Sequence, residues 1–197
     1  MPTLAWIAVG IIVLTSVGLL LTRDWRTGII MLAVQYLAMF VLTLSHLPLG
    51  MASVKVVSGW MAAAILGMTR SDINEPVEEE SLWPQGRLFR VFVAIMIGLI
   101  VATAATTVNE IMADAGLAVT AGSLLLIGMG LLHLGITSSV LRVTQGLLTV
   151  MTGFEILYSA VEQSALVLAL LAVINLGLAL VGSYLMIASN PRQTEIS

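Results

Sequence analysis

The chain has 197 residues, of which 59% are hydrophobic and only 10% are charged. Soluble domains carry about 25% charged residues, so the composition excludes a soluble protein and indicates an all-α integral membrane protein. The formal net charge of −3 says little, because the position of the charges matters more than their sum. The absence of cysteine excludes disulfides, thiolate metal sites and cysteine nucleophiles.

A spanning helix needs about 20 mainly apolar residues, so seven spans would use nearly the whole chain. They leave no room for a soluble catalytic domain. The N-terminal segment lacks a basic region before its apolar run, so we expect a retained helix rather than a cleaved signal. The seven predicted spans are residues 3–22, 27–45, 51–69, 89–107, 118–138, 145–164 and 166–188.

The arginines predict the orientation of these spans. With seven spans, every arginine falls on one side, and the connections on the other side contain no Lys or Arg. The positive-inside rule then places the N-terminus outside and the C-terminus in the cytoplasm, as in a multi-pass protein of the cell inner membrane. The seven arginines are Arg23, Arg26, Arg70, Arg87, Arg90, Arg142 and Arg192.

The chain divides into five predicted regions. They are an N-terminal three-helix unit (1–70), an acidic cytoplasmic loop (71–88), a linking helix with an outer loop (89–117), a second three-helix unit (118–189) and a cytoplasmic tail (190–197). Gln35 and Glu155 are 120 positions apart, as are Lys55 and Asn175. The shared offset suggests duplicated three-helix units, although equal helix lengths would also produce it, so both explanations stay open.

The sixth predicted span carries a polar stripe. Its members step by three or four residues, which places them on one face of a helix. They are Gln145, Thr149, Thr152, Glu155, Ser159 and Glu162. Glu155 is predicted to lie near the middle of its span, where an ionisable side chain is costly and usually faces protein or a water-filled path. It is either a proton-exchanging group or a permanently protonated, structural one.

Three other ionisable side chains are candidates for a proton path. Glu162 lies nearer the outer end of the stripe, where it is either solvated or the mouth of the path. Lys55, the only lysine, either extends its ammonium group to the membrane surface or is a buried cation that pairs with a carboxylate or relays a proton. His133 is either a proton relay, since histidine titrates near neutral pH, or a hydrogen-bonding partner between helices.

The remaining polar residues do not suggest catalysis. Gln35 and Asn175 are expected to form interhelical hydrogen bonds, and His46 to be solvated in an outer loop. Two distant histidines without cysteine make a poor metal site, and no phosphate-binding or nucleophile motif is present. We therefore expect no catalytic site, no metal, no cofactor and no nucleic-acid partner.

The segment from Leu134 to Val161, LGITSSVLRVTQGLLTVMTGFEILYSAV, resembles the small three-helix K (4L) subunit of respiratory complex I. That family has a basic turn followed by a helix with a central glutamate in an IELMLNAV-like context. Here FEILYSAV occupies this place and Arg142 the turn, so the family's central glutamate corresponds to Glu155. The family's second glutamate, in its third helix, has no counterpart, since Asn175 is the polar residue of the seventh span.

The resemblance covers roughly the last 75 residues. With its additional N-terminal helices, the chain also resembles component E of membrane complexes of the hydrogenase-4 and formate hydrogenlyase type. The resemblance implies a non-catalytic subunit of an oxidoreductase complex that lines a proton or cation path beside antiporter-like membrane subunits. A self-contained ion transporter and a purely structural membrane subunit are the alternatives. Glu155→Gln is expected to leave assembly intact and to lower ion translocation.

Overall fold

The computed structural model describes residues 2–73, 86–112 and 115–189, and these form seven helices, each long and apolar enough to cross a membrane. The all-helical, multi-pass architecture expected from the composition is therefore confirmed for the described residues. The helices are α1 (Pro2–Leu21), α2 (Trp25–Thr43), α3 (Leu49–Asp72), α4 (Arg87–Ile111), α5 (Leu117–Ile136), α6 (Val140–Val161) and α7 (Ala165–Ala188). Most of the predicted acidic loop and the whole predicted tail lie outside the described residues.

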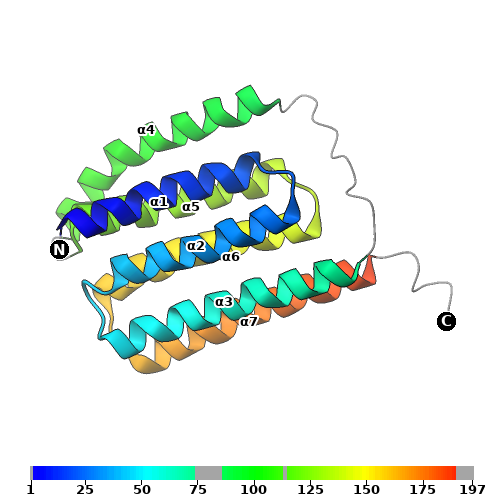
Figure 1. The fold of residues 1–197 in the computed structure, drawn as a ribbon. Helices are drawn as coiled ribbons and strands as arrows, with labels where there is room; N and C mark the ends of the chain where they lie inside the picture. Colours follow the sequence, from blue (N-terminus) through cyan, green and yellow to red (C-terminus); the bar gives the residue numbers. More distant parts are fainter. Residues whose placement is uncertain (1, 74–85, 113–114, 190–197) are drawn as a thin grey trace.

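The helices lie in antiparallel succession and pack as three pairs. α1 contacts α5, α2 contacts α6 and α3 contacts α7, while α4 packs beside the first pair (Figure 1). Each predicted three-helix unit therefore forms a row in chain order, and the two rows lie face to face. The order is the one that a duplication predicts. The duplication itself stays a prediction.

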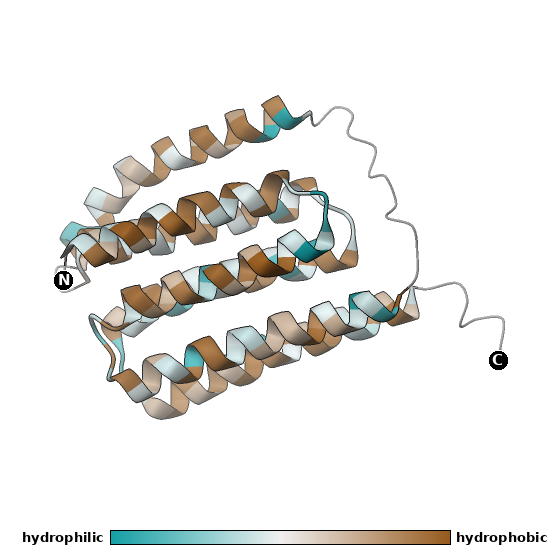
Figure 2. Ribbon diagram, viewed as in Figure 1, coloured by the Kyte–Doolittle hydropathy of each residue, from teal (hydrophilic) through white to brown (hydrophobic). Residues whose placement is uncertain are grey.

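The two ends of the helical bundle differ in charge. Antiparallel succession brings the α1–α2 and α5–α6 turns, the end of α3 and the start of α4 to one end (Figure 1). We call this the arginine end, since it carries six of the arginines: Arg23, Arg26, Arg70, Arg87, Arg90 and Arg142. The strongly hydrophilic positions gather mainly at helix ends, whereas apolar positions dominate the helix interiors (Figure 2).

Several helices extend further than the sequence predicted; α3, for example, ends at Asp72 rather than 69. α6 begins at Val140 rather than 145, which places Arg142 inside the helix and not in the preceding turn. α4 continues to Ile111, so Glu110 also lies in a helix. In both cases the charged side chain lies near a helix terminus, where a long polar side chain reaches the membrane surface without ending the helix. Hydropathy alone had assigned these residues to connections.

Short polar segments start and end the helices. Asp24 caps α2, and its carboxylate accepts hydrogen bonds from the backbone N–H groups of Arg26 and Thr27. The hydroxyl of Thr27 and these N–H groups hold the pKa of the Asp24 carboxyl below its usual value. Gly116, whose φ is 80°, directly precedes α5, and this left-handed conformation favours glycine.

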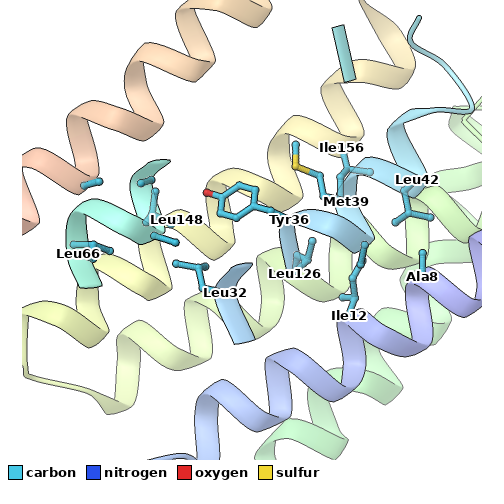
Figure 3. Packing of buried hydrophobic residues seen from close by; sticks show 14 of the residues in the cluster. Ala8, Ile12, Leu32, Tyr36, Met39, Leu42, Leu66, Leu126, Leu148 and Ile156 are labelled. Atoms are coloured by element: carbon cyan, nitrogen blue, oxygen red, sulfur yellow. The ribbon is translucent and has the colours of Figure 1, made fainter. Parts of the chain in front are cut away.

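The main core runs through both rows of helices. It is built from buried Leu, Ile, Met, Val and Ala side chains of every helix except α4. Figure 3 shows Tyr36 among these residues, together with Leu148, Met39 and Ile156. Because the rows share one core, the polar residues of α2 and α3 face those of α6 and α7 across it.

Candidate functional site

The polar stripe of α6 faces the interior of the bundle, as predicted. Gln145, Thr149, Thr152, Glu155 and Ser159 are all buried, and none exposes more than 3% of its surface. Only Glu162, at the end of the helix, is exposed. The stripe therefore contacts protein rather than lipid, and Glu155 is its one carboxylate inside the bundle.

Glu155 forms an ion pair with Lys55. The Nζ atom of Lys55, on α3, lies 3.0 Å from Oε2 of Glu155, and the two residues are only 2% and 1% exposed. The same Nζ lies 3.5 Å from the backbone carbonyl oxygen of Glu155. Of the two interpretations open for Lys55, the structure therefore shows the buried, paired cation and not the side chain that reaches the membrane surface.

Asn175 completes the site from a third helix. Its Nδ2 atom, on α7, donates a hydrogen bond of 2.6 Å to Oε1 of Glu155. Both carboxylate oxygens are thus engaged, one by a cation and the other by a neutral amide. The interhelical hydrogen bond expected of Asn175 is confirmed, and the site joins α3, α6 and α7.

The site is electrostatically balanced and costly to disturb. Burial penalises each charge, but the neighbouring opposite charge offsets that penalty as long as both are present. Such a pair has a second neutral form, in which the proton has moved from the ammonium to the carboxylate. Addition or removal of one proton instead leaves a net charge in an apolar interior. The pair is therefore sensitive to the arrival and departure of protons.

Glu155 is not central in its helix, contrary to the prediction. It lies 15 residues after Val140 and six before Val161, or about 22 Å and 9 Å along the axis. The prediction failed because it placed both ends of the helix too late, the start by five residues and the end by three. The ion pair is thus closer to the end opposite the arginine end, while Gln35 lies near the middle of α2.

A second polar group lies between α1, α2 and α6. The Gln35 Nε2 atom donates to the Ser16 hydroxyl at 2.9 Å, and the Thr149 hydroxyl donates to Gln35 Oε1 at 3.2 Å. This confirms the interhelical role expected of Gln35. Gln145, one turn further along α6, packs its amide against Gly28 of α2, where a Cβ atom would lie 3.1 Å from Nε2.

The sequence analysis missed Tyr36. Its side chain is fully buried, and its hydroxyl lies close to Thr152 and within electrostatic reach of Glu155. The ring packs onto Gly59 of α3, where a Cβ atom would stand 2.2 Å from a ring carbon. A single tyrosine in an apolar helix gives no sign that it faces inward. The available signal was the glycine one turn after Lys55, because a glycine on a packed face makes room for a large neighbour.

The remaining two candidates are not brought to Glu155. Glu162 ends α6, and its carboxylate accepts hydrogen bonds from the backbone N–H groups of Gln163 and Ser164 at the start of α7. His133 is buried near the arginine end, with its ring against Gly146. Nine residues of α6, about 13 Å, separate Gly146 from Glu155. Neither side chain has a direct contact that would make it the next proton carrier.

The arginines near His133 have a structural role at the end of α1. The Arg90 guanidinium donates to the backbone carbonyl of Leu20 at 3.1 Å, and that of Arg142 donates to the carbonyl of Thr22. The last carbonyls of a helix lack partners within it and attract cations. These two side chains thus tie α4 and α6 to α1.

His46 differs from expectation as well. It is partly buried, and its Nε2 atom lies 3.0 Å from the backbone carbonyl oxygen of Ala115, to which it can donate. This contact joins the α2–α3 turn to the start of α5. Within residues 2–73, 86–112 and 115–189, no three His, Asp or Glu side chains gather closely enough to hold a metal ion.

Comparison with known proteins identifies no relative. No family model matches the chain, and neither a curated protein nor a solved structure does.

Proposed function

We propose that this chain is a non-catalytic membrane subunit of a complex I-like or hydrogenase-4-like assembly, and that the Lys55–Glu155 pair is a proton-exchanging site in its ion path. The observation that carries the proposal is the ion pair itself, buried between three helices with Asn175 on the free carboxylate oxygen. Buried ionisable groups within membrane spans commonly mark ion and proton paths. The resemblance of the segment around Glu155 to the K subunit supports the same reading.

The geometry supports a simple exchange. A proton that reaches the Glu155 carboxylate converts it to a neutral acid and leaves the Lys55 ammonium without its counterion. The uncompensated charge favours the release of a proton, either from Lys55 or from Glu155. In either case one proton enters and one leaves, and the pair returns to its neutral state. Asn175 can hold the carboxyl group in position throughout, because its amide both donates and accepts hydrogen bonds.

In the proposed assembly, redox cofactors belong to other subunits and this chain contributes a segment of the path. Its partners are antiporter-like membrane subunits and the lipid of the cell inner membrane. The orientation proposed is the one that the arginines predict, with the arginine end in the cytoplasm.

A structural role is the second candidate, and the same pair favours it. Lys55 and Glu155 come from helices that are far apart in sequence, and their pairing links α6 to α3, which itself packs on α2 and α7. Buried polar groups in some proteins are retained because they specify one arrangement of the helices. In that case the pair never exchanges protons during turnover.

The experiment that separates the two candidates measures proton uptake by membrane vesicles together with redox turnover. Glu155→Gln is paired with the double variant Glu155→Gln/Lys55→Met, in which no buried charge is left alone. We expect both variants to move fewer protons per electron. Glu110→Gln, an exposed carboxylate on α4, is the matched control and should keep normal coupling. Normal coupling in a well-assembled double variant would refute the proposal and assign the pair to structure.

The self-contained transporter is tested separately. The purified chain is reconstituted alone into liposomes, and proton flux is followed with an internal pH indicator. If the chain belongs to a larger assembly, we expect no flux above that of empty liposomes. Flux that depends on Glu155 would replace the subunit proposal with the transporter.

A further inference from the structure

The Tyr36 hydroxyl oxygen, Asn175 Oδ1 and Gln145 Nε2 are buried polar atoms with no hydrogen-bond partner among the described residues. Their side chains are 0–3% exposed. Asn175 contacts the ion pair from α7, whereas Gln145 lies ten residues of α6, about 15 Å, from Glu155. More than nine in ten buried polar groups in proteins are hydrogen-bonded to protein or to ordered water. Two of these atoms, on Tyr36 of α2 and Gln145 of α6, belong to the interface between these helices, which indicates that something polar occupies it.

These atoms and their neighbours form a series from Glu155 toward the arginine end. The Tyr36 hydroxyl lies close to Thr152, one turn of α6 from Glu155, and is within electrostatic reach of the Glu155 carboxylate. Thr149 and Gln35 follow one turn further on, joined by their 3.2 Å hydrogen bond. Gln145 comes next, and its amide packs on Gly28 in the first turn of α2. The series thus ends where α2 begins.

The opposite direction is mixed. Ser159 on α6 and Thr43 on α2 are buried hydroxyls on that side of the ion pair. Between the α2–α3 turn, α3 and α7, Leu47, Ala52 and Leu168 form a buried hydrophobic cluster, against which Phe40 and Met51 pack. Both Ser159 and Thr43 donate to backbone carbonyls of their own helices, so the unpartnered polar atoms between α2 and α6 lie toward the arginine end.

We propose that ordered water molecules occupy the interface between α2, α3 and α6 from Glu155 to Gln145, and that they connect the ion pair to the arginine end. A buried water molecule needs two to four polar partners. The Tyr36 hydroxyl and the Gln145 amide can donate to such water. The Thr152 and Thr149 hydroxyls donate to protein oxygens and can accept hydrogen bonds from it. The role of this water in proton exchange rests on the proposed function, but its presence does not.

Hydroxyl-radical footprinting with mass spectrometry tests the inference on the full chain in lipid nanodiscs. Radicals generated from water oxidise side chains that water contacts, even inside a protein. Met39 is the internal reference, because it is as buried as Tyr36, lies three residues away on α2 and has no hydroxyl or amide that would hold a water molecule. Thioethers are oxidised more readily than phenols. We expect Tyr36 to be oxidised several-fold faster than Met39 in spite of this.

A pair of variants tests the path. Gln145→Leu removes the amide that links the interface to the arginine end, and we expect oxidation of Tyr36 to fall several-fold. Thr43→Val changes a buried hydroxyl near the other end of α2 and should leave oxidation of Tyr36 unchanged. A fall in Thr43→Val and none in Gln145→Leu would show that water enters from the opposite end, which overturns the inference.

The comparison of Tyr36 with Met39 in the wild-type protein tests the inference even if a variant does not fold. Protection of Tyr36 equal to that of Met39 would show a dry interface and overturn the proposal, whatever Glu155→Gln does to coupling. Rapid oxidation of Tyr36 combined with normal coupling in the Glu155 variants would support the hydrated interface and remove the proposed function. The two proposals therefore fail by different results.

Discussion

Removal of one member of the Lys55–Glu155 pair should destabilise the protein strongly, and removal of both should not. The two residues are separated by 100 positions and come together only in the folded bundle. Each is almost completely buried, so loss of one partner leaves the other charge without compensation. Such a change costs about 3–5 kcal/mol, whereas replacement of both partners by neutral residues of similar volume is often neutral or stabilising.

The variants Glu155→Gln and Lys55→Met should therefore each lower the free energy of unfolding by about 3–5 kcal/mol. Independent effects would sum to about 6–10 kcal/mol in the double variant, which we instead expect within about 2 kcal/mol of the wild type. The lysine beside Glu155 leads us to expect a less stable Glu155→Gln variant. The expectation that this variant assembles normally stays a prediction.

Reversible unfolding of the purified chain by sodium dodecyl sulfate in mixed micelles, followed by circular dichroism, gives these free energies. Glu110→Gln, on the exposed surface of α4, is the control and should change the free energy by less than about 0.5 kcal/mol. A double variant as unstable as the sum of the single variants would refute the reasoning. It would mean that the two charges do not interact in the folded protein.

Three further predictions follow from single positions. Gly59→Ala places a methyl group where the Tyr36 ring lies and should cost about 1–3 kcal/mol in the same unfolding assay; no loss would mean that the ring packs elsewhere. Asp24→Ala removes the α2 cap and should cost about 1 kcal/mol near neutral pH. The pKa of Asp24 is lowered in the folded protein. The difference in unfolding free energy between wild type and Asp24→Ala should therefore be complete at pH values above the pKa of Asp24 in the unfolded chain, near 3.9. It should shrink as the pH falls through the pKa of Asp24 in the folded protein, and a difference that stays constant across the pH series would contradict this. Cysteines introduced at Ser71 and Gln163, in a chain with no native cysteine, should react with an impermeant maleimide from opposite sides of the membrane, and labelling of both from one side would reject the seven-span topology.

The sequence predicted the helices well because a membrane span needs a long apolar run, which is visible without any tertiary information. It also predicted the inward face of α6, since the polar residues recur with the helical period. It could not choose between the two interpretations of Lys55. That choice depends on which helix packs against α3, and hydropathy does not show pairings between helices. Tyr36 was missed for the same reason, because a tyrosine suits both lipid-facing and buried positions.

The position of Glu155 along its helix was mispredicted for a different reason. The end of a helix depends on local capping and on how far charged side chains reach, so Arg142 was assigned to a turn although it lies in the first turns of α6. An error of five residues moved the ion pair from the apparent centre toward one end. The sequence also offered no means to place the hydrophobic cluster near that end, because its members come from separate helices and a turn.

The distance in sequence between Lys55 and Glu155 has a consequence for biosynthesis. Chains grow at about 5–20 residues per second, so the helix that contains Lys55 forms about 5–20 s before its counterion is made. A lysine at the centre of a span costs about 2.5–3.5 kcal/mol on insertion, but Lys55 lies only six residues from the start of α3. In the nascent protein its ammonium can still reach the membrane surface, about 9 Å away, and it becomes buried when α6 and α7 arrive. Chains truncated before α6 should therefore show a Lys55 amine that reacts with an impermeant acylating reagent, and a protected amine in such chains would show that another group shields it first.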